Sequence, residues 1–543
     1  MLLTELYPYQ EDIPGRLMDK GSVLGALDTG LGKTVATIAA AERMLAHDEA
    51  TILIVCPSGL RLQWARALAQ HTDVETQIRR IGGRDMAIPT ERWCVILGGT
   101  PEKRATQVKD VYNRRPNYVI AGYETAVEAI RKLRYFADFV IIDEGTVLSS
   151  FKAKRAEKLR SIAGEYKALL TATPIEHAPE NIYGPMAWLA PGLLGTPEEF
   201  ERAFIRRTRW GQVTRYTNLP TLHNLLKPYL VRKRIEDADV APYMPETQFH
   251  TWTVGMSWRQ RQIYGQVAQD LAAALVEVKG GADFDIAAYY AGMDESTKAG
   301  RAMAIYTTLQ MLLNHPQLVK KSAEEYLSQR DSKRKTTTGS AYAVRLMESG
   351  VLDTIGDTPK FLHVVERVRR ILDEDPAHKV VIVSRYKGMQ PLFIRAFAPY
   401  KVLDYHGQQP EAIRMATVDC FNQDEDARIL VMSHAGAYGV DLPGGSHLIN
   451  YDPPLSAGQR VQINGRIRRA SSRHRRVAII DVVTEGSLEV RQYERLTVKR
   501  AVASAVIDGY GADERGGVDA RVVSLSRHAD EAAAWVGGSD PSY

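Results

Sequence analysis

Two glycines followed by a lysine and a threonine form the clearest candidate for chemistry in this sequence. Gly30-Leu31-Gly32-Lys33-Thr34 follows the apolar run Ser22–Leu27 and precedes a helical pattern. Glycines let backbone N–H groups wrap phosphates, and a helix N-terminus adds a favourable dipole. Lys33 is then expected to reach the β- and γ-phosphates of a nucleotide, and the Thr34 hydroxyl to ligate Mg²⁺. Leu27 replaces the first glycine of the general phosphate-loop pattern, so an ordinary glycine-rich turn is the alternative.

A pair of carboxylates follows Lys33 by 110 residues (143 − 33 = 110). Asp143 and Glu144 end the apolar run Val140-Ile141-Ile142. A carboxylate at such a strand end can hold Mg²⁺ through water, and its neighbour can polarise the attacking water. Alone, an Asp-Glu pair in this position usually marks a solvated turn. Together with Lys33, the pair favours nucleotide hydrolysis.

Two late arginines provide a candidate for stabilising transferred phosphate. Arg466 and Arg469 stand three residues apart, so one helix face can carry both. An arginine directed at a γ-phosphate raises turnover by about 10³–10⁵. We predict this role for both residues. A basic surface patch or plain binding of phosphate backbones is the better interpretation of the other arginines in this stretch, Arg468, Arg473, Arg475 and Arg476.

Short apolar, β-branched runs must position these groups. Near-continuous runs of this kind suit strands of parallel sheets that are covered by helices on both faces. They fall into two sets, which predict two α/β domains. The first set comprises Ser22–Leu27, Thr51–Val55, Tyr118–Ala121, Phe139–Asp143 and Ala168–Thr173, and the second comprises Lys379–Ser384, Arg428–Ser433, His447–Asp452 and Arg476–Val483.

The stretch between the two sets has helical periodicity. Trp258, Tyr264 and Leu271 indicate one amphipathic helix, and Ile305 and Leu309 begin another. We therefore predict the following division: a first lobe over 1–195 that binds ATP, a helical insertion and inter-lobe segment over 196–345, a second lobe over 346–510, and a partly disordered tail over 511–543. Within the insertion, the polar stretch Asp331–Ser340 is read as a linker.

Composition restricts the class of protein only mildly. The net charge of +5 arises from 70 basic and 65 acidic residues, which does not by itself indicate a polyanionic partner. The three cysteines, Cys56, Cys94 and Cys420, have no metal-ligand or disulfide spacing and suit a reducing compartment. No signal peptide is evident, and no apolar run approaches the roughly 20 residues that span a bilayer. We expect a cytoplasmic protein, either nucleoid-associated or in a phage-infected host cell.

Read in order, the motifs resemble superfamily-two helicases, and within them the Swi/Snf-type ATPases. The opening Leu6-Tyr7-Pro8-Tyr9-Gln10 is similar to that family's adenine-reading motif, which makes Gln10 the adenine candidate. The resemblance also implies coupling or DNA-contact roles for further residues of the first lobe. These are Ser58 in the segment from Cys56 to Trp64, Tyr123 in Gly122-Tyr123-Glu124-Thr125, and Thr171 and Thr173 in Leu170-Thr171-Ala172-Thr173-Pro174.

The resemblance continues into the second half. Leu225–Arg234 and Asn314-His315-Pro316 are similar to markers of Swi/Snf proteins that generic helicases lack. It implies coupling or DNA roles for Ser384, Arg385 and Ser433, and contact of Asp441 with the ribose. Three positions depart from the family: Thr146 replaces a histidine, Asp441 replaces a common asparagine, and Asp452-Pro453-Pro454-Leu455 lacks a tryptophan. The remaining length has no room for the accessory modules of remodellers, so the chain resembles a minimal bacterial or viral motor.

The expected architecture is therefore α/β, with two RecA-like parallel-sheet lobes and a helical insertion between them. ATP and Mg²⁺ are the expected cofactors, and DNA, most simply duplex DNA held largely without sequence preference, is the expected partner. Protein partners for targeting are possible, and no membrane is expected. A strand-separating helicase, the motor subunit of a restriction or repair complex, and an ATP-switched DNA clamp remain alternatives.

Several other features are explained by solvation or packing alone. Two basic runs fit a solvated surface and a contact with DNA phosphates equally well, namely Arg206-Arg207-Thr208-Arg209 and Lys333-Arg334-Lys335. His315 is expected to pack or cap a helix. Trp64, Trp188 and Trp258 are expected in the core.

Overall fold

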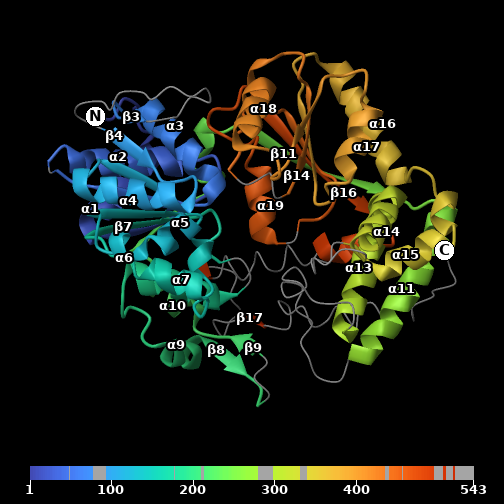
Figure 1. The fold of residues 1–543 in the computed structure, drawn as a ribbon, viewed down its shortest axis with the longest axis horizontal. Helices are drawn as coiled ribbons and strands as arrows, with labels where there is room; N and C mark the ends of the chain where they lie inside the picture. Colours follow the sequence, from blue (N-terminus) through green and yellow to red (C-terminus); the bar gives the residue numbers. More distant parts are fainter. Residues whose placement is uncertain are drawn as a thin grey trace.

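The computed structural model describes residues 1–47, 49–76, 93–175, 178–209, 213–278, 297–330, 339–434, 439–454, 456–493, 506–508 and 518–519. Within these residues the chain forms two parallel sheets covered by helices, a helical insertion and a small antiparallel sheet (Figure 1). The predicted α/β class with two parallel-sheet lobes is confirmed. The basic run at 333–335 and most of the predicted linker and tail lie outside the described residues.

The first lobe is built on a sheet whose described strands run in the order β10-β1-β7-β6-β2-β5-β4-β3, with every pair parallel. Successive side chains of a strand point to opposite faces, so Val23 and Leu27 join one apolar core and Leu24 and Ala26 the other. The strands are β1 Ser22–Leu27, β2 Ile52–Cys56, β3 Glu75–Thr76, β4 Trp93–Ile96, β5 Tyr118–Gly122, β6 Phe139–Asp143, β7 Tyr166–Leu170 and β10 Leu230–Lys233.

Helices cover both faces of this sheet. One face packs against α1 Asp12–Lys20, α2 Lys33–Leu45 and α3 Arg61–His71. The opposite face packs against α4 Pro101–Arg114, α5 Tyr123–Glu128, α6 Ile130–Leu133, α7 Lys154–Arg160, α8 Tyr183–Leu189, α9 Pro197–Phe204 and α10 Leu219–Leu226. Below it, β8 Ile205–Arg207, β9 Val213–Tyr216 and β17 Val518–Asp519 form the small antiparallel sheet.

The second lobe repeats this plan with described strands in the order β11-β16-β15-β12-β14-β13, again all parallel. The strands are β11 Glu246–Val254, β12 Val380–Ser384, β13 Val402–Tyr405, β14 Ile429–Ser433, β15 His447–Asn450 and β16 Arg476–Thr484. On one face lie α16 Pro359–Glu374 and α17 Met389–Ala396, and on the other α18 Glu411–Gln423 and α19 Ala457–Asn464.

The insertion has its own apolar core, to which Leu271, Leu309 and Tyr342 contribute. Figure 1 shows its helices gathered beside the second lobe and away from the first. His315 at the joint between two of them is buried and packs on Phe361, as predicted. Its Nδ1 accepts from the Gln317 amide, and its Nε2 donates to Asp357 Oδ1 at 2.9 Å. The helices are α11 Trp258–Val278, α13 Lys298–Asn314, α14 Pro316–Arg330 and α15 Ala341–Glu348.

The domain boundaries differ from those predicted. Within the predicted insertion over 196–345, α9, β8, β9, α10 and β10 belong to the first lobe, and β11 is an edge strand of the second. Val506 and Ile507, predicted to end the second lobe, are buried in the core of the first. The differences arise because strand pairing and burial between distant segments decide membership of a lobe, and local periodicity does not report them.

Two predictions about tryptophans are confirmed and one is wrong. Trp64 and Trp188 are buried, whereas Trp258 is 63% exposed at the first position of α11, under the Arg259 guanidinium. Helical spacing identified the helix but not which of its first residues faces the core. Among the described residues, no helix is both long and apolar enough to cross a membrane.

Candidate nucleotide site between the two lobes

The glycine-rich loop between β1 and α2 has the geometry of a phosphate cradle. Gly30 and Gly32 have φ angles of 87° and 79°, a region that favours glycine. No side chain caps the N-terminus of α2, and a helix N-terminus attracts negative charge. Lys33 donates from Nζ to the carbonyl oxygens of Leu27 at 2.8 Å and Asp28 at 3.2 Å, which curls its side chain back over the loop.

Burial perturbs the lysine of this loop. Desolvation lowers the pKa of Lys33 from 10.5 to about 8, against the opposing charges of Glu144, Asp143 and Asp28, while Arg469 lowers it further. Two carboxylates from the end of β6 act on this ammonium, and Arg469 of the second lobe lies against the loop, because a Cβ atom added to Gly30 would come within 3.0 Å of its Cγ. The loop lysine, the carboxylate pair and a late arginine therefore share one site.

Asp143 is held firmly at the end of β6. Its Oδ2 accepts a 2.8 Å hydrogen bond from Trp64 Nε1, and its Oδ1 accepts one of 2.9 Å from the Glu144 amide. Desolvation raises the pKa of Asp143, and these two donors, Lys33 and Arg466 oppose the rise. A fixed carboxylate beside a lysine and an arginine suits a cation that is shared with phosphate oxygens.

Glu144 adopts a backbone conformation that is uncommon outside glycine, with φ 51°. The Tyr123 hydroxyl donates to the carbonyl oxygens of Asp143 and Glu144, the latter at 3.0 Å. Glu144 Oε2 accepts a 2.8 Å hydrogen bond from Nε2 of Gln462, which lies on α19 of the second lobe. Non-glycine residues in this conformation cluster at functional sites, and this one links the two lobes directly.

Both predicted arginines of the second lobe face this site. Arg466 is only 4% exposed, and its charge acts on Asp143. Arg469 pairs with Asp441 at 2.5 Å, and its Nη2 donates to the Val440 carbonyl at 3.3 Å. The charge of Arg469 acts on Lys33. The structure thus brings together Lys33, Asp143, Arg466 and Arg469 from segments more than 300 residues apart (466 − 143 = 323).

The two lobes contact each other at two glycines, Gly30 of the first lobe and Gly465 of the second. A Cβ atom added to Gly30 would lie 2.2 Å from the Arg468 carbonyl oxygen, and one added to Gly465 would lie 1.5 Å from Thr29 Oγ1. Thr29 also donates to the Val461 carbonyl of the second lobe at 3.1 Å. Contacts this close leave no space for a methyl group at either glycine, so the described conformation is a closed one.

Gln10 lies over the phosphate loop. Its Nε2 donates to the Leu31 carbonyl at 3.0 Å, and its Oε1 accepts from the Tyr7 amide at 3.0 Å. The rings of Tyr7 and Tyr243 pack against each other at a tilt of 36°, with their centroids 4.4 Å apart. Gln10 therefore braces the loop, and its role as the adenine reader stays a prediction.

The predicted coupling and DNA residues differ in accessibility. Ser58 is exposed, at the start of the 3-10 turn Ser58–Leu60. Thr171, Ser384 and Ser433 are buried, at 1%, 0% and 7% exposed. The buried Thr173 hydroxyl has no hydrogen-bond partner among the described residues. For the buried hydroxyls, contact with DNA stays a prediction that requires another conformation.

Asp452 connects several of these coupling segments. It accepts hydrogen bonds from the Ser384 hydroxyl at 2.6 Å and the Arg385 amide at 2.8 Å, and from Asn314 of the insertion at 3.4 Å. The Arg385 guanidinium donates to Gln310 and to Tyr386. The strand ends of the second lobe are thus tied to the insertion.

Sequence reasoning left Asp452, Gln462 and Trp64 without these roles. Gln462 stands four residues before Arg466 on the same helix and its turn, and that spacing is the signal that could have identified it. The arginines predicted as surface groups divide: Arg473, Arg475 and Arg476 are exposed, but Arg468 is 13% exposed. Arg468 donates to Thr247 at 3.0 Å and lies over the Phe249 ring, so it does not belong to an exposed basic patch, and binding of phosphate backbones by Arg468 stays a prediction.

The amino-acid sequence of this chain is similar to a known protein family and to individual proteins. The chain matches the family described as SNF2-related domain over residues 18–318, and the helicase conserved C-terminal domain over residues 363–471. It is 23% identical over 499 residues to the uncharacterized ATP-dependent helicase YqhH of Bacillus subtilis, across 89% of this chain and 76% of that protein. It is 23% identical over 505 residues to the DNA repair and recombination protein RAD54 of Saccharomyces cerevisiae, across 89% of this chain but only 52% of that protein.

A solved structure shows the same fold. The helicase domain of Hef from Pyrococcus furiosus has a TM-score of 0.50 with this chain, at 16% identity, across 90% of this chain and 97% of that one.

Proposed function

Because this chain belongs to the SNF2-related family and is a nucleic-acid-dependent ATPase, we propose that it couples ATP hydrolysis to movement along duplex DNA. The resemblance predicted from the motifs is thereby confirmed. The observation that carries the proposal is the contact of the two lobes at the phosphate loop and the carboxylate pair, where Glu144 accepts a 2.8 Å hydrogen bond from Gln462 and Arg469 packs on Gly30. Charges from both lobes act at one site, so nucleotide state can control how the lobes meet.

The residues of the first lobe suit a nucleotide with Mg²⁺. Gly30, Gly32 and the N-terminus of α2 would cradle phosphates, with Lys33 neutralising their charge. Thr34 and Asp143 offer the oxygen ligands that Mg²⁺ prefers, and the bound ion would neutralise charge on the phosphates. Gln10 would contact the adenine and Asp441 the ribose.

Hydrolysis requires groups from both lobes. We assign Glu144 as the base that polarises the attacking water, with its carboxylate oriented by Gln462. Arg466 and Arg469 would stabilise the charge that develops on the transferred phosphate. After phosphate leaves, these arginines lose the anion that attracts them to the first lobe, which favours separation of the lobes. Repeated closing and opening would move the lobes along the strand.

DNA is proposed as the track. Ser58 and Tyr123 of the first lobe and Arg385 and Ser433 of the second lie at the ends of strands of their sheets. Contacts from such positions to the phosphate backbone give affinity without sequence preference. Thr171, Thr173 and Ser384 would transmit the nucleotide state to these contacts. We further propose that protein partners target the motor, and that it acts in the cytoplasm of a bacterial or phage-infected cell.

The test is the ATPase rate with duplex DNA, single-stranded DNA and RNA side by side, together with displacement of a third strand from a DNA triplex. We expect duplex DNA to stimulate hydrolysis most and ATP to drive triplex displacement, with Lys33→Ala inactive in both. Stimulation without displacement would refute a translocase and indicate an ATP-switched clamp. Separation of a simple duplex would indicate a strand-separating helicase, and co-purification with a nuclease or methylase would indicate a motor subunit.

A further inference from the structure

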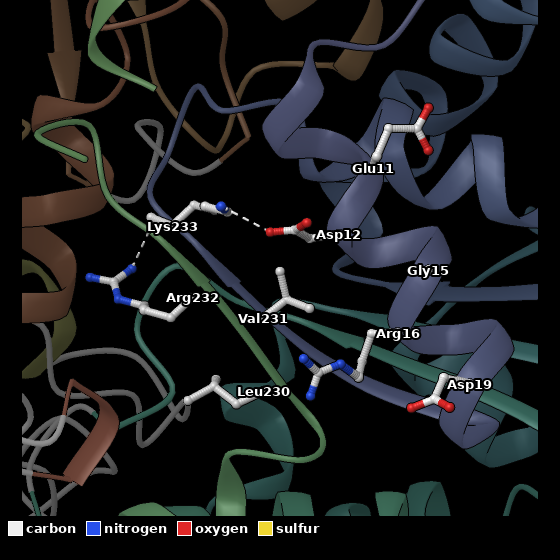
Figure 2. A pocket seen from close by; sticks show the side chains of 9 residues that line it. All are labelled: Glu11, Asp12, Gly15, Arg16, Asp19, Leu230, Val231, Arg232 and Lys233. Carbon is white, nitrogen blue, oxygen red and sulfur yellow. Dashed lines mark hydrogen bonds and ion pairs between the residues drawn. The ribbon is translucent and has the colours of Figure 1, made fainter. Parts of the chain in front are cut away.

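Arg232 lies on β10, the edge strand of the first lobe, and contacts the start of the phosphate loop. Its Nη1 donates to the Ala26 carbonyl at 2.7 Å and to Asp28 Oδ1 at 2.8 Å. Figure 2 shows Arg232 and its neighbour Lys233 pointing to opposite sides, with Lys233 directed at Asp12 across a groove of about 590 Å³. None of the residues assigned to the nucleotide lines that groove. Of the two side chains, only that of Arg232 therefore contacts the loop.

Asp28 is the first residue of that loop and fixes its geometry. Its Oδ2 accepts from the Ile235 amide at 3.3 Å, while its own amide donates to the Lys233 carbonyl at 3.0 Å. Its carbonyl oxygen accepts a hydrogen bond from Lys33 at 3.2 Å. The side chain is 15% exposed. Any movement of Asp28 consequently moves a group that holds the phosphate-binding lysine.

A third group completes this arrangement from far along the chain. Asp508 is 7% exposed, and its Oδ1 accepts from Arg232 Nε at 3.1 Å and from Arg234 Nε at 3.2 Å. The arginines hold the pKa of Asp508 below its ordinary value, although burial raises it. Val506 and Ile507, just before it, are 0% and 4% exposed in the core of the first lobe, and the Val506 carbonyl lies 3.0 Å from His223 Nδ1.

Residues 506–508 follow the whole second lobe in sequence, yet they pack on the first. The helical turn around Leu488 and Glu489 still belongs to the second lobe, where Glu489 forms a buried ion pair of 2.6 Å with Lys360. The chain therefore returns to the first lobe after finishing the second. Asp508 places a second carboxylate on Arg232, opposite Asp28, and this restricts the guanidinium to one orientation.

We propose that Arg232 is a positioning residue for the phosphate loop, and that Asp508 of the returning segment holds it in place. The inference rests on the proposed ATP site. The returning segment thereby contributes to nucleotide affinity from outside the ATP-binding lobe in sequence. Two N–H donors of one planar group reach Asp28 and Asp508 together, which a lysine cannot reproduce.

The experiment compares Arg232→Ala with Lys233→Ala in the full chain. Both remove one positive charge from the same strand, but of the two side chains only that of Arg232 contacts Asp28. We measure binding of a fluorescent ATP analogue at equilibrium, and KM and kcat for ATP hydrolysis with DNA present. Arg232→Ala should raise Kd and KM about tenfold, the effect of losing one charge-assisted hydrogen bond, with kcat changed less than about threefold. Lys233→Ala should leave both constants within about twofold.

Asp508→Asn keeps the shape of the side chain and covers the case in which Arg232→Ala fails to fold, as judged by circular dichroism. It should raise Kd and KM in the same direction, by about threefold or more. The inference is overturned if folded Asp508→Asn and Arg232→Ala bind the analogue like the unaltered protein, or if Lys233→Ala weakens binding as much as Arg232→Ala. If the unaltered protein fails to bind the analogue, the proposed ATP site fails with it, so the two failures are distinguishable.

Discussion

Raising the pH should weaken ATP binding through a single group, Lys33. Burial lowers its pKa to about 8, whereas the ordinary value is 10.5. Bound phosphates favour the charged ammonium, so above pH 8 binding must first return a proton to the lysine. Affinity therefore falls as pH rises through that pKa.

The magnitude follows from the fraction of protein that carries the charge. With a pKa of about 8, roughly nine tenths of Lys33 is protonated at pH 7 and one tenth at pH 9, so Kd should rise about tenfold between them. With the ordinary value of 10.5, the change over the same range would be a few per cent, which is about the error of the measurement. Equilibrium binding of a non-hydrolysable ATP analogue from pH 7 to pH 10 distinguishes the two.

Lys33→Arg provides the matched control, because a guanidinium stays charged throughout this range. The control concerns the shape of the pH profile and not the absolute affinity: the Kd of Lys33→Arg for the ATP analogue should not change with pH. A flat profile for the unaltered protein would refute the burial argument. A parallel decline in both proteins would assign the titration to another group.

Three further substitutions test the hydrolytic groups. Glu144→Gln should bind ATP but hydrolyse it about 10²–10⁴ times more slowly, since an amide accepts no proton; full turnover would remove the assignment of the base. Arg466→Ala should lower kcat about 10³-fold with little change in ATP affinity, and the exposed Arg473→Ala, which we expect to keep a normal rate, is its control. Gln462→Ala should lower kcat about tenfold by releasing Glu144; steady-state assays that find only KM changed would contradict this orienting role.

The strands that carry the site could be predicted from sequence because they are continuous apolar runs. β1 and β6 have the predicted bounds, and both end at residues of the site. β10 and β11 gave no such signal: β10 has two charged residues in four, and most of β11 is exposed on the edge of its sheet. These edge strands are stabilised by pairing with strands that are distant in the sequence, β10 with β1 and β11 with β16. Local sequence does not report such a partner strand.

The membership of the site was predictable in part. Lys33, Asp143, Glu144, Arg466 and Arg469 stood out by residue type, spacing and resemblance, and the structure gathers them. Their catalytic roles stay predictions. Asp508 could not be found in this way, because it follows an alanine-rich stretch with no motif. Its contact with Arg232 depends on the path of the chain through both lobes.

The facing pair Gly465 and Thr29 limits how this protein can change over evolution. The space between them is smaller than a methyl group. A larger side chain at position 465 would therefore prevent the two lobes from closing. A larger residue at position 465 is then tolerated only when Thr29 is replaced by a smaller one, because Gly465 has no side chain to lose. Among related sequences we expect positions 29 and 465 to vary together. The double substitution that exchanges threonine and glycine between these positions should restore the contact between the lobes, which a larger residue at position 465 alone would disrupt.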